Sequence, residues 1–443
     1  MQKWGNKHIA FSFPKSLRIV DLPLNGKLTG YTFKTPIFCL LLLFLVQNLS
    51  AQNNTLDFYV SKALSNSPLI KDYNNQIRTI GIDSEMIRAS YKPQVNGTSN
   101  NYYAPVIKGW GYDNAITNGA NISALVGVSK AIVSQKNLQT QFEALRLTAQ
   151  GIKNTSQISE QDIRRTVTAQ YILTYGDWQQ LTFIQEVYDL LQKEDIILKK
   201  LAQGNIYKQT DYLTFLVTLQ QQKLALKQAD IQYHSDYATL AYLCGINDTS
   251  TIGLQEPILP VYQFPEAENS IFFKQYVIDS LKNINSRQVI DFSYRPKVNV
   301  FGDGGYNSSL AYTPYKNFGA SIGISMTLPI YDGKQRKMKY SKIDIAEQTR
   351  KSYSSFFNHQ YKQQLDLLSA QLTSTEDLII EINNQIKYSE GLVRAHLQLL
   401  TTGEVRIADL VIALNNYMTA KNLLAQNRTN RWQIINQINY WSR

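Results

Sequence analysis

The sequence repeats itself once over a long interval, and this duplication limits the folds that the chain can adopt. The segment Ser90-Tyr91-Lys92-Pro93 returns as Ser293-Tyr294-Arg295-Pro296, and Asp211 falls on Asp409 at nearly the same offset. Copies of this length are too long for the short units of a solenoid protein. We therefore expect two similar halves, residues 52–249 and 268–443, joined by a proline-rich linker at 250–267.

Two long tracts without proline, 106–256 and 330–443, predict long helices. An interior proline removes a backbone hydrogen bond and clashes with the preceding turn, so such tracts suit uninterrupted helices. One helix is expected at 54–90. Long helices should follow Ser134 and Asp332, which can each cap a helix N-terminus, and return helices are expected at 208–244 and 405–442.

The second long helix carries a heptad repeat. Apolar residues recur at strict seven-residue spacing, and a mixed companion series lies three positions later. The first series is Leu365, Leu372, Ile379, Ile386, Val393 and Leu400, and the second is Leu368, Thr375, Ile382, Ser389 and His396. A sustained heptad is typical of helices that pack side by side along a narrow seam.

A different pattern separates the helices in each half, with β-hairpins expected at about 92–133 and 296–330. The last strand alternates strictly between apolar residues and small or polar ones. The apolar positions are Phe318, Ala320, Ile322, Ile324, Met326, Leu328 and Ile330. Almost no charge lies on either face, which favours a lipid-facing barrel strand over a strand in a soluble sandwich, although this strand alone leaves the sandwich open.

The N-terminal region predicts an export signal. Basic residues precede a ten-residue apolar run, Ile37 to Val46, which is too short to span a bilayer and fits a signal-peptide core. We expect a leader and signal peptide at 1–51 with cleavage after Ala51; a buried apolar segment is the alternative. The leader holds six basic residues and one acid, so the net charge of +11 falls to about +6 and the case for nucleic-acid binding weakens.

No motif for catalysis, cofactor binding or metal binding is found in the sequence. It has no phosphate-binding loop, nucleophile elbow or zinc-protease motif. His234, His359 and His396 are on separate helical segments without the spacing of metal ligands, and Cys244 is the single cysteine after the leader. We therefore expect no enzyme, no cofactor and no metal centre.

The ordered set of motifs resembles the TolC-type outer-membrane efflux channel family over nearly all of the mature chain. The motifs are the two Ser-Tyr-[Lys/Arg]-Pro entries to the hairpins and the exit Leu328-Pro329-Ile330-Tyr331-Asp332-Gly333. Two helix turns complete the set, one from Gly204 to Asp211 and one from Gly403 to Asp409. The implied fold is mostly α, with helix, hairpin, helix, turn and helix in each repeat.

The resemblance implies a homotrimer in the outer membrane of a Gram-negative bacterium. Each protomer would give four strands to a twelve-stranded barrel in outer-membrane lipid, and its helices would form a periplasmic tunnel. Such a channel is the passive exit duct of a tripartite efflux or type I secretion system. Its partners are a periplasmic adaptor protein and an inner-membrane transporter, and the residues do not single out a cargo. A secreted or envelope-anchored coiled-coil structural or adhesion protein is the alternative.

The resemblance also places functional residues at the two turns, about 204–211 and 403–409. Asp211 and Asp409 match aspartates near the closed periplasmic entrance, where three inward carboxylates would attract cations. The competing interpretation is that each aspartate only stabilises the N-terminus of the return helix. Arg406 is close enough to pair with an acid at the turn, but a solvated arginine is the simpler expectation. Ile412 and Leu400 replace an acid and a tyrosine found at the entrance in some family members.

Overall fold

The computed structural model describes residues 54–111, 119–248, 250–262, 265–310 and 313–443. Residues from Gln52 to Arg443 belong to one compact unit, which contains both predicted halves. The predicted leader and signal peptide, 1–51, lies outside the described residues, as does part of the first hairpin loop. No helix within the described part of the chain is long and apolar enough to cross a membrane.

The first half contains four helices and a hairpin. In chain order they are α2 (Leu56–Asn66), α3 (Pro68–Ser90), β1 (Gln94–Ala104), β2 (Gly119–Ile132), α4 (Gln135–Gln203) and α5 (Gln209–Cys244). The prediction of one helix at 54–90 is wrong, because the helix breaks at Ser67. Pro68 has no N–H to continue the first helix, and the Ser67 hydroxyl accepts a 3.4 Å hydrogen bond from the N–H of Ile70, which starts the second.

The second half has the same order of elements. It contains α6 (Ile271–Ser293), β3 (Lys297–Ser308), β4 (Phe318–Thr327), α7 (Gln335–Leu400) and α8 (Ile407–Trp441), with short 3₁₀ helices at Ala267–Asn269 and Pro314–Lys316. The N-cap residue of α7 is Lys334, at a φ of 67°, and not Asp332 as predicted. The Asp332 carboxylate nevertheless accepts a 2.7 Å hydrogen bond from the Arg336 N–H, so it still caps the helix from a distance.

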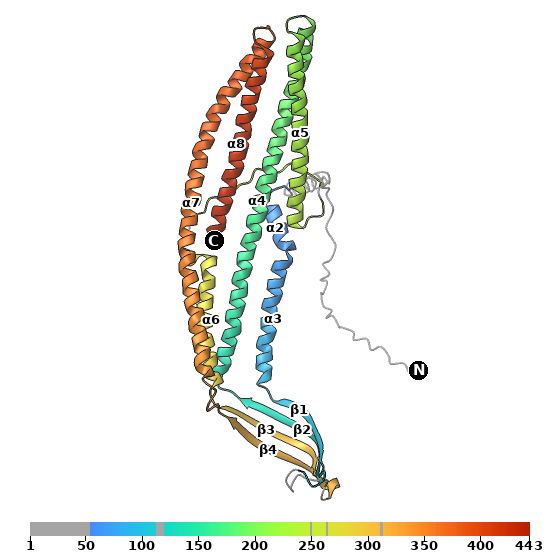
Figure 1. Cartoon of the computed structure of the whole chain (residues 1–443), viewed down its shortest axis with the longest axis vertical. Helices are drawn as coiled ribbons and strands as arrows, with labels where there is room; N and C mark the ends of the chain where they lie inside the picture. The colour runs from blue at the N-terminus through green and yellow to red at the C-terminus, as the bar shows by residue number, and fades with distance from the viewer. Residues whose placement is uncertain (1–53, 112–118, 249, 263–264, 311–312) are drawn as a thin grey trace, which may run out of the picture. The chain divides into compact units, whose positions relative to one another are not determined.

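The helices run side by side, and both helix turns lie at the end away from the sheet (Figure 1). With 69 residues, α4 extends about 100 Å at about 1.5 Å per residue. The predicted heptad is confirmed: Ile386, Val393 and Leu400 of α7 are buried in clusters that include residues of α8. The companion positions Thr375 and Ser389 are also buried, and their hydroxyls donate to carbonyl oxygens four residues earlier.

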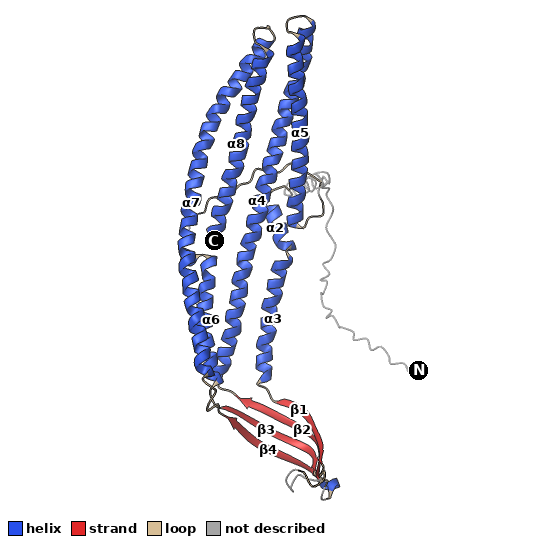
Figure 2. Ribbon diagram, in the orientation of Figure 1, coloured by secondary structure: helices blue, strands red, loops and turns tan. Residues whose placement is uncertain are grey.

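The four strands form one antiparallel sheet in the order β1-β2-β3-β4 (Figure 2). The β2–β3 ladder joins the two hairpins, with Gly127 opposite Asp303 and Val126 opposite Gly304. The strands β1 and β4 each have a neighbour on one side only among the described residues. The sheet therefore has two edges whose backbone groups are available to pair with further strands.

One face of this sheet is apolar and exposed. Register places Val126 and Val128 of β2 on the same face as Ile322 and Ile324 of β4, and Ile322 is 87% exposed. The expectation that Leu328 and Ile330 continue the strand is wrong, because β4 ends at Thr327 and Pro329 cannot donate to a ladder. The described strands form a single sheet, without the second layer that a soluble sandwich needs.

Candidate functional site

The two helix turns, far apart in sequence, contact each other. Tyr207 is buried at the first turn, and its hydroxyl lies 3.0 Å from the carbonyl oxygen of Leu400 and 2.9 Å from that of Val405 in the second turn. Residues of both turns share one apolar cluster, which includes Leu198, Phe215, Ile407 and Leu410. The pair of turns is therefore one packed structure within the protomer.

The two glycines predicted to end the long helices do so differently. Gly403 has a φ of 80°, in the left-handed region that favours glycine, and a Cβ there would lie 2.9 Å from the Cγ2 of Ile206. Gly204 has a φ of −81°, and the left-handed residue of the first turn is Asn205 at 63°. Asparagine tolerates this conformation better than most residues. Only the second turn therefore requires its glycine.

Asp409 lies in the first turn of α8 and is paired with Arg406. The guanidinium Nε and Nη2 atoms each donate a 2.9 Å hydrogen bond to the carboxylate, so Arg406 is paired with Asp409 although its side chain remains exposed to solvent. Hydrogen bonding and charge from Arg406, with a smaller contribution from His396, hold the pKa of Asp409 below its usual range. The carboxylate is thus ionised, but its charge is partly balanced by an arginine that is itself largely exposed.

Asp211 has the matching place in the first turn of α5 but a different environment. It is half-buried, and no ion pair within the described part of the chain includes it. Both aspartates are placed to stabilise a helix N-terminus. They differ in pairing: Arg406 forms an ion pair with Asp409, whereas Lys208, at the equivalent position before Asp211, forms no ion pair among the described residues.

Two polar contacts at the turns were not predicted from the sequence. Besides Tyr207, the Tyr212 hydroxyl donates a 2.9 Å hydrogen bond to the carboxylate of Asp195 across the first turn. Both tyrosines follow the turn glycine of the first half, where the second half has Val405 and Leu410 in comparable places. The two tyrosines can be seen in the sequence, but the groups that they hydrogen-bond depend on how the two turns pack in the fold.

We expect removal of the Tyr207 hydroxyl to loosen the contact between the turns. Tyr207→Phe leaves the ring in the apolar cluster but takes a donor from two buried carbonyl groups, at a cost of about 1–3 kcal/mol. Backbone amides of residues 400–409 should exchange hydrogen for deuterium faster than in the unmodified protein. Tyr188→Phe is the control, since Tyr188 only accepts an exposed hydrogen bond from Gln192. Equal exchange in both variants would show that the tyrosine does not hold the turns together.

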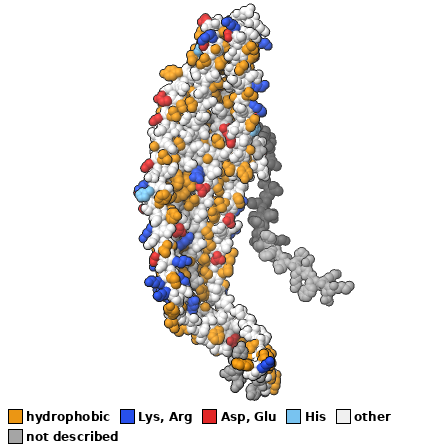
Figure 3. Space-filling view, viewed as in Figure 1, with side chains coloured by type: hydrophobic (Ala, Val, Ile, Leu, Met, Phe, Trp, Pro, Cys, Tyr) orange, Lys and Arg blue, Asp and Glu red, His pale blue; other side chains and the backbone are white. Residues whose placement is uncertain are grey.

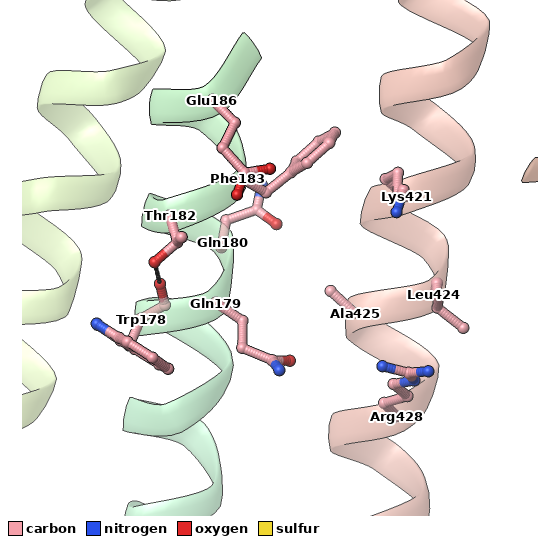
Figure 4. A pocket seen from close by; sticks show the side chains of 10 residues that line it. All are labelled: Trp178, Gln179, Gln180, Thr182, Phe183, Glu186, Lys421, Leu424, Ala425 and Arg428. Atoms are coloured by element: carbon pink, nitrogen blue, oxygen red, sulfur yellow. Dashed lines mark hydrogen bonds between the residues drawn. The ribbon is translucent and has the colours of Figure 1, made fainter. Parts of the chain in front are cut away.

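A pocket of about 280 Å³ lies between α4 and α8, closer to the middle of the helices (Figure 4). Phe183 and Glu186 come from α4, and Lys421 and Arg428 come from α8. The Nζ atom of Lys421 lies 5.9 Å from the centroid of the Phe183 ring. Charged side chains of both signs, Glu186, Lys421 and Arg428, line the pocket. No group of three or more His, Cys, Asp or Glu within the described residues could hold a metal ion.

No protein-family model matches the sequence. No curated protein matches it either. Solved structures do match the fold. The structure of CusC, from work on transmembrane channel formation, matches this chain with a TM-score of 0.71. The two sequences are 12% identical, and the match covers 88% of this chain and 92% of CusC. The outer membrane protein VceC from Vibrio cholerae gives 0.70 at 11% identity over 87% of this chain and 96% of that one.

A third structure is the open state of the outer membrane channel MtrE from Neisseria gonorrhoeae. It matches with a TM-score of 0.69 at 13% identity over 88% of each chain. All three likenesses cover helices and sheet together, because they extend over most of both chains. The chain therefore has the fold of the TolC-type outer-membrane channels.

Proposed function

We propose that the protein is a passive channel of the outer membrane of a Gram-negative bacterium. The observation that carries this proposal is the four-stranded sheet, which has an exposed apolar face and two unpaired edges at one end of long helices. An apolar face of this kind matches the lipid-facing side of a transmembrane barrel. A coiled-coil structural or adhesion protein would have no use for such a face.

We propose that three protomers assemble into one channel. Four strands are too few to close a barrel with a lumen, whereas twelve strands from three copies are enough. The outer helices also carry apolar side chains that lack cover in one protomer: α3 has no buried residue, and Ile82, Met86, Ile345 and Phe356 of α3 and α7 are exposed. Hydrophobic side chains reach the surface along the helices (Figure 3). Packing between neighbouring subunits would cover them.

The helical part would then form a periplasmic tunnel with its entrance at the two turns. A periplasmic adaptor and an inner-membrane transporter would deliver the cargo and supply the energy for transport, because a passive channel has no energy source of its own. CusC is described for transmembrane channel formation, VceC as an outer membrane protein and MtrE as an outer membrane channel, which supports a channel role for this chain.

The entrance can be tested in planar lipid bilayers with the purified protein. We expect single-channel currents that trivalent cations block from the side of the helix turns, because carboxylates near a threefold axis concentrate negative potential.

Asp211→Ala should reduce the block more than Asp409→Ala, since Arg406 already balances the charge of Asp409. Arg406→Gln should increase the block by freeing the Asp409 carboxylate. Unchanged block in the double variant Asp211→Ala, Asp409→Ala would overturn the placement of these aspartates at the entrance.

A further inference from the structure

The strands of the sheet carry very little charge. β1 and β4 have no charged residue, β2 has Lys130, and β3 has Lys297 and Asp303. Lys297 is the first residue of β3 and Lys130 lies near the end of β2, so both are at the end of the sheet that joins the helices. Asp303 is in the middle of its strand and is the only carboxylate in the four strands.

Asp303 lies on the face opposite the exposed apolar one. It pairs in register with Gly127 on one side and with Ser321 on the other, and the Ser321 hydroxyl donates a 2.8 Å hydrogen bond to its carboxylate. The neighbouring residues Gly302 and Gly304 instead pair with Ile322 and Ala320 of the apolar face. A charge in the middle of a membrane strand is tolerated where it faces water, so this face should line the lumen.

Asp303 is partly exposed on this face. Gly127, which has no side chain, is directly opposite Asp303, and the atom nearest to a Cβ added there would be the Asp303 Cβ at 3.8 Å. The nearest large side chain on this face of β3 is Phe301, and its ring reaches over Gly323 of β4, because a Cβ added there would lie 2.6 Å from the Phe301 Cζ. Asp303 is thus a partly exposed charged group whose cross-strand neighbours are Gly127 and Ser321.

We propose that Asp303 sets the ion preference of the barrel, independently of the helix turns. This inference rests on the proposed trimeric channel, in which three copies of Asp303 would face one lumen at the same depth. Lys297 lies on the same face but six residues away, about 20 Å along the strand, whereas the screening length at about 0.1 M salt is about 10 Å. The lysine therefore does not cancel the aspartate.

The size of the effect follows from simple electrostatics. Twelve strands spaced about 4.8 Å apart and tilted about 40° close into a barrel of about 12 Å radius, which leaves each carboxylate about 10 Å from the axis. Three such charges, screened by about 0.1 M salt, raise the cation concentration on the axis about twofold and lower the anion concentration about twofold. The ratio of cation to anion permeability should then be about fourfold higher than without them.

The test measures the zero-current potential of the purified channel in planar bilayers under a KCl gradient. Asp303→Asn keeps the shape and the acceptor for Ser321 but removes the charge, so the permeability ratio of K⁺ to Cl⁻ should fall about fourfold. Asp303→Ser should give the same fall with a side chain common on this face. Asp303→Glu should retain the preference, and Asp303→Lys should shift it towards anions.

The outcomes separate this inference from the proposed function. The same fall for Asp303→Asn in the double variant Asp211→Asn, Asp409→Asn supports a determinant inside the barrel. Equal permeability ratios in the unmodified protein, Asp303→Asn and Asp303→Ser would overturn the role of Asp303 while the channel itself stands. If the unmodified protein conducts no ions and forms no trimer, the proposed function fails, and the role of Asp303 fails with it.

Discussion

Ile324→Arg is expected to lower the amount of folded protein in the outer membrane, whereas Ser325→Arg should be milder. The two residues are adjacent in β4 but point to opposite faces, and Ile324 is 73% exposed on the apolar one. An arginine in contact with lipid costs about 2–4 kcal/mol at the middle of the bilayer and less towards its edge, and a trimer would incur that cost three times. Ile324 lies towards the helix end of the sheet, where Lys130 of the same face is in register with it through Val300. At Ser325, opposite Asn299, water in the lumen can hydrate the guanidinium.

The measurement is the amount of folded protein in purified outer membranes after equal expression. The comparison controls for the charge and size of arginine, because both variants introduce the same side chain one residue apart. Equal loss of the two variants would show that the faces of the sheet are assigned wrongly.

Gly305→Ala should prevent the two hairpins from joining. Gly305 has a φ of 153°, and a Cβ there would lie 2.2 Å from the carbonyl oxygen of Ala124 and 3.0 Å from the Cα of Leu125. Both contacts are with the backbone of β2, so no side chain can rotate away and the strands must separate. The strained backbone alone costs about 1–3 kcal/mol. The displaced β2–β3 ladder adds to this, and that ladder is the link between the two hairpins.

Gly319→Ala is the matched control, because Gly319 pairs directly with Gly305 but has no atom within 4 Å of its added Cβ. We expect Gly305→Ala to lose the heat-modifiable mobility of a folded barrel on gel electrophoresis, and Gly319→Ala to retain it. If both alanine variants keep the shift, the close approach of β2 and β3 at Gly305 does not limit assembly.

Features that repeat along the chain were predictable from the sequence. The heptad of α7, the alternation in β4 and the duplicated order of motifs depend on residue spacing, which a long regular element preserves. The break at Ser67 was also readable, because Pro68 follows a residue that can cap a helix. It was missed because the surrounding helical pattern continues through it.

Contacts between distant segments were not predictable in the same way. The two turn glycines hold equivalent sequence positions, yet only Gly403 has a left-handed backbone conformation. In the first turn the left-handed residue is Asn205, which follows Gly204. The three-residue spacing of Arg406 and Asp409 allows an ion pair, but whether the pair forms depends on the side-chain rotamers at the start of α8. The bonds of Tyr207 to the second turn join residues almost 200 positions apart, and only the packed turns bring them together.

The central claim is that three copies of this chain form one barrel, and the mass of the assembled protein tests it most directly. Chemical crosslinking in native outer membranes, followed by extraction in mild detergent, should yield a species of three times the protomer mass. Its β-sheet signal in circular dichroism should disappear together with the trimer on heating, because the edge strands β1 and β4 would be paired between protomers. A detergent-stable monomer that retains its full β-sheet content would contradict the shared barrel.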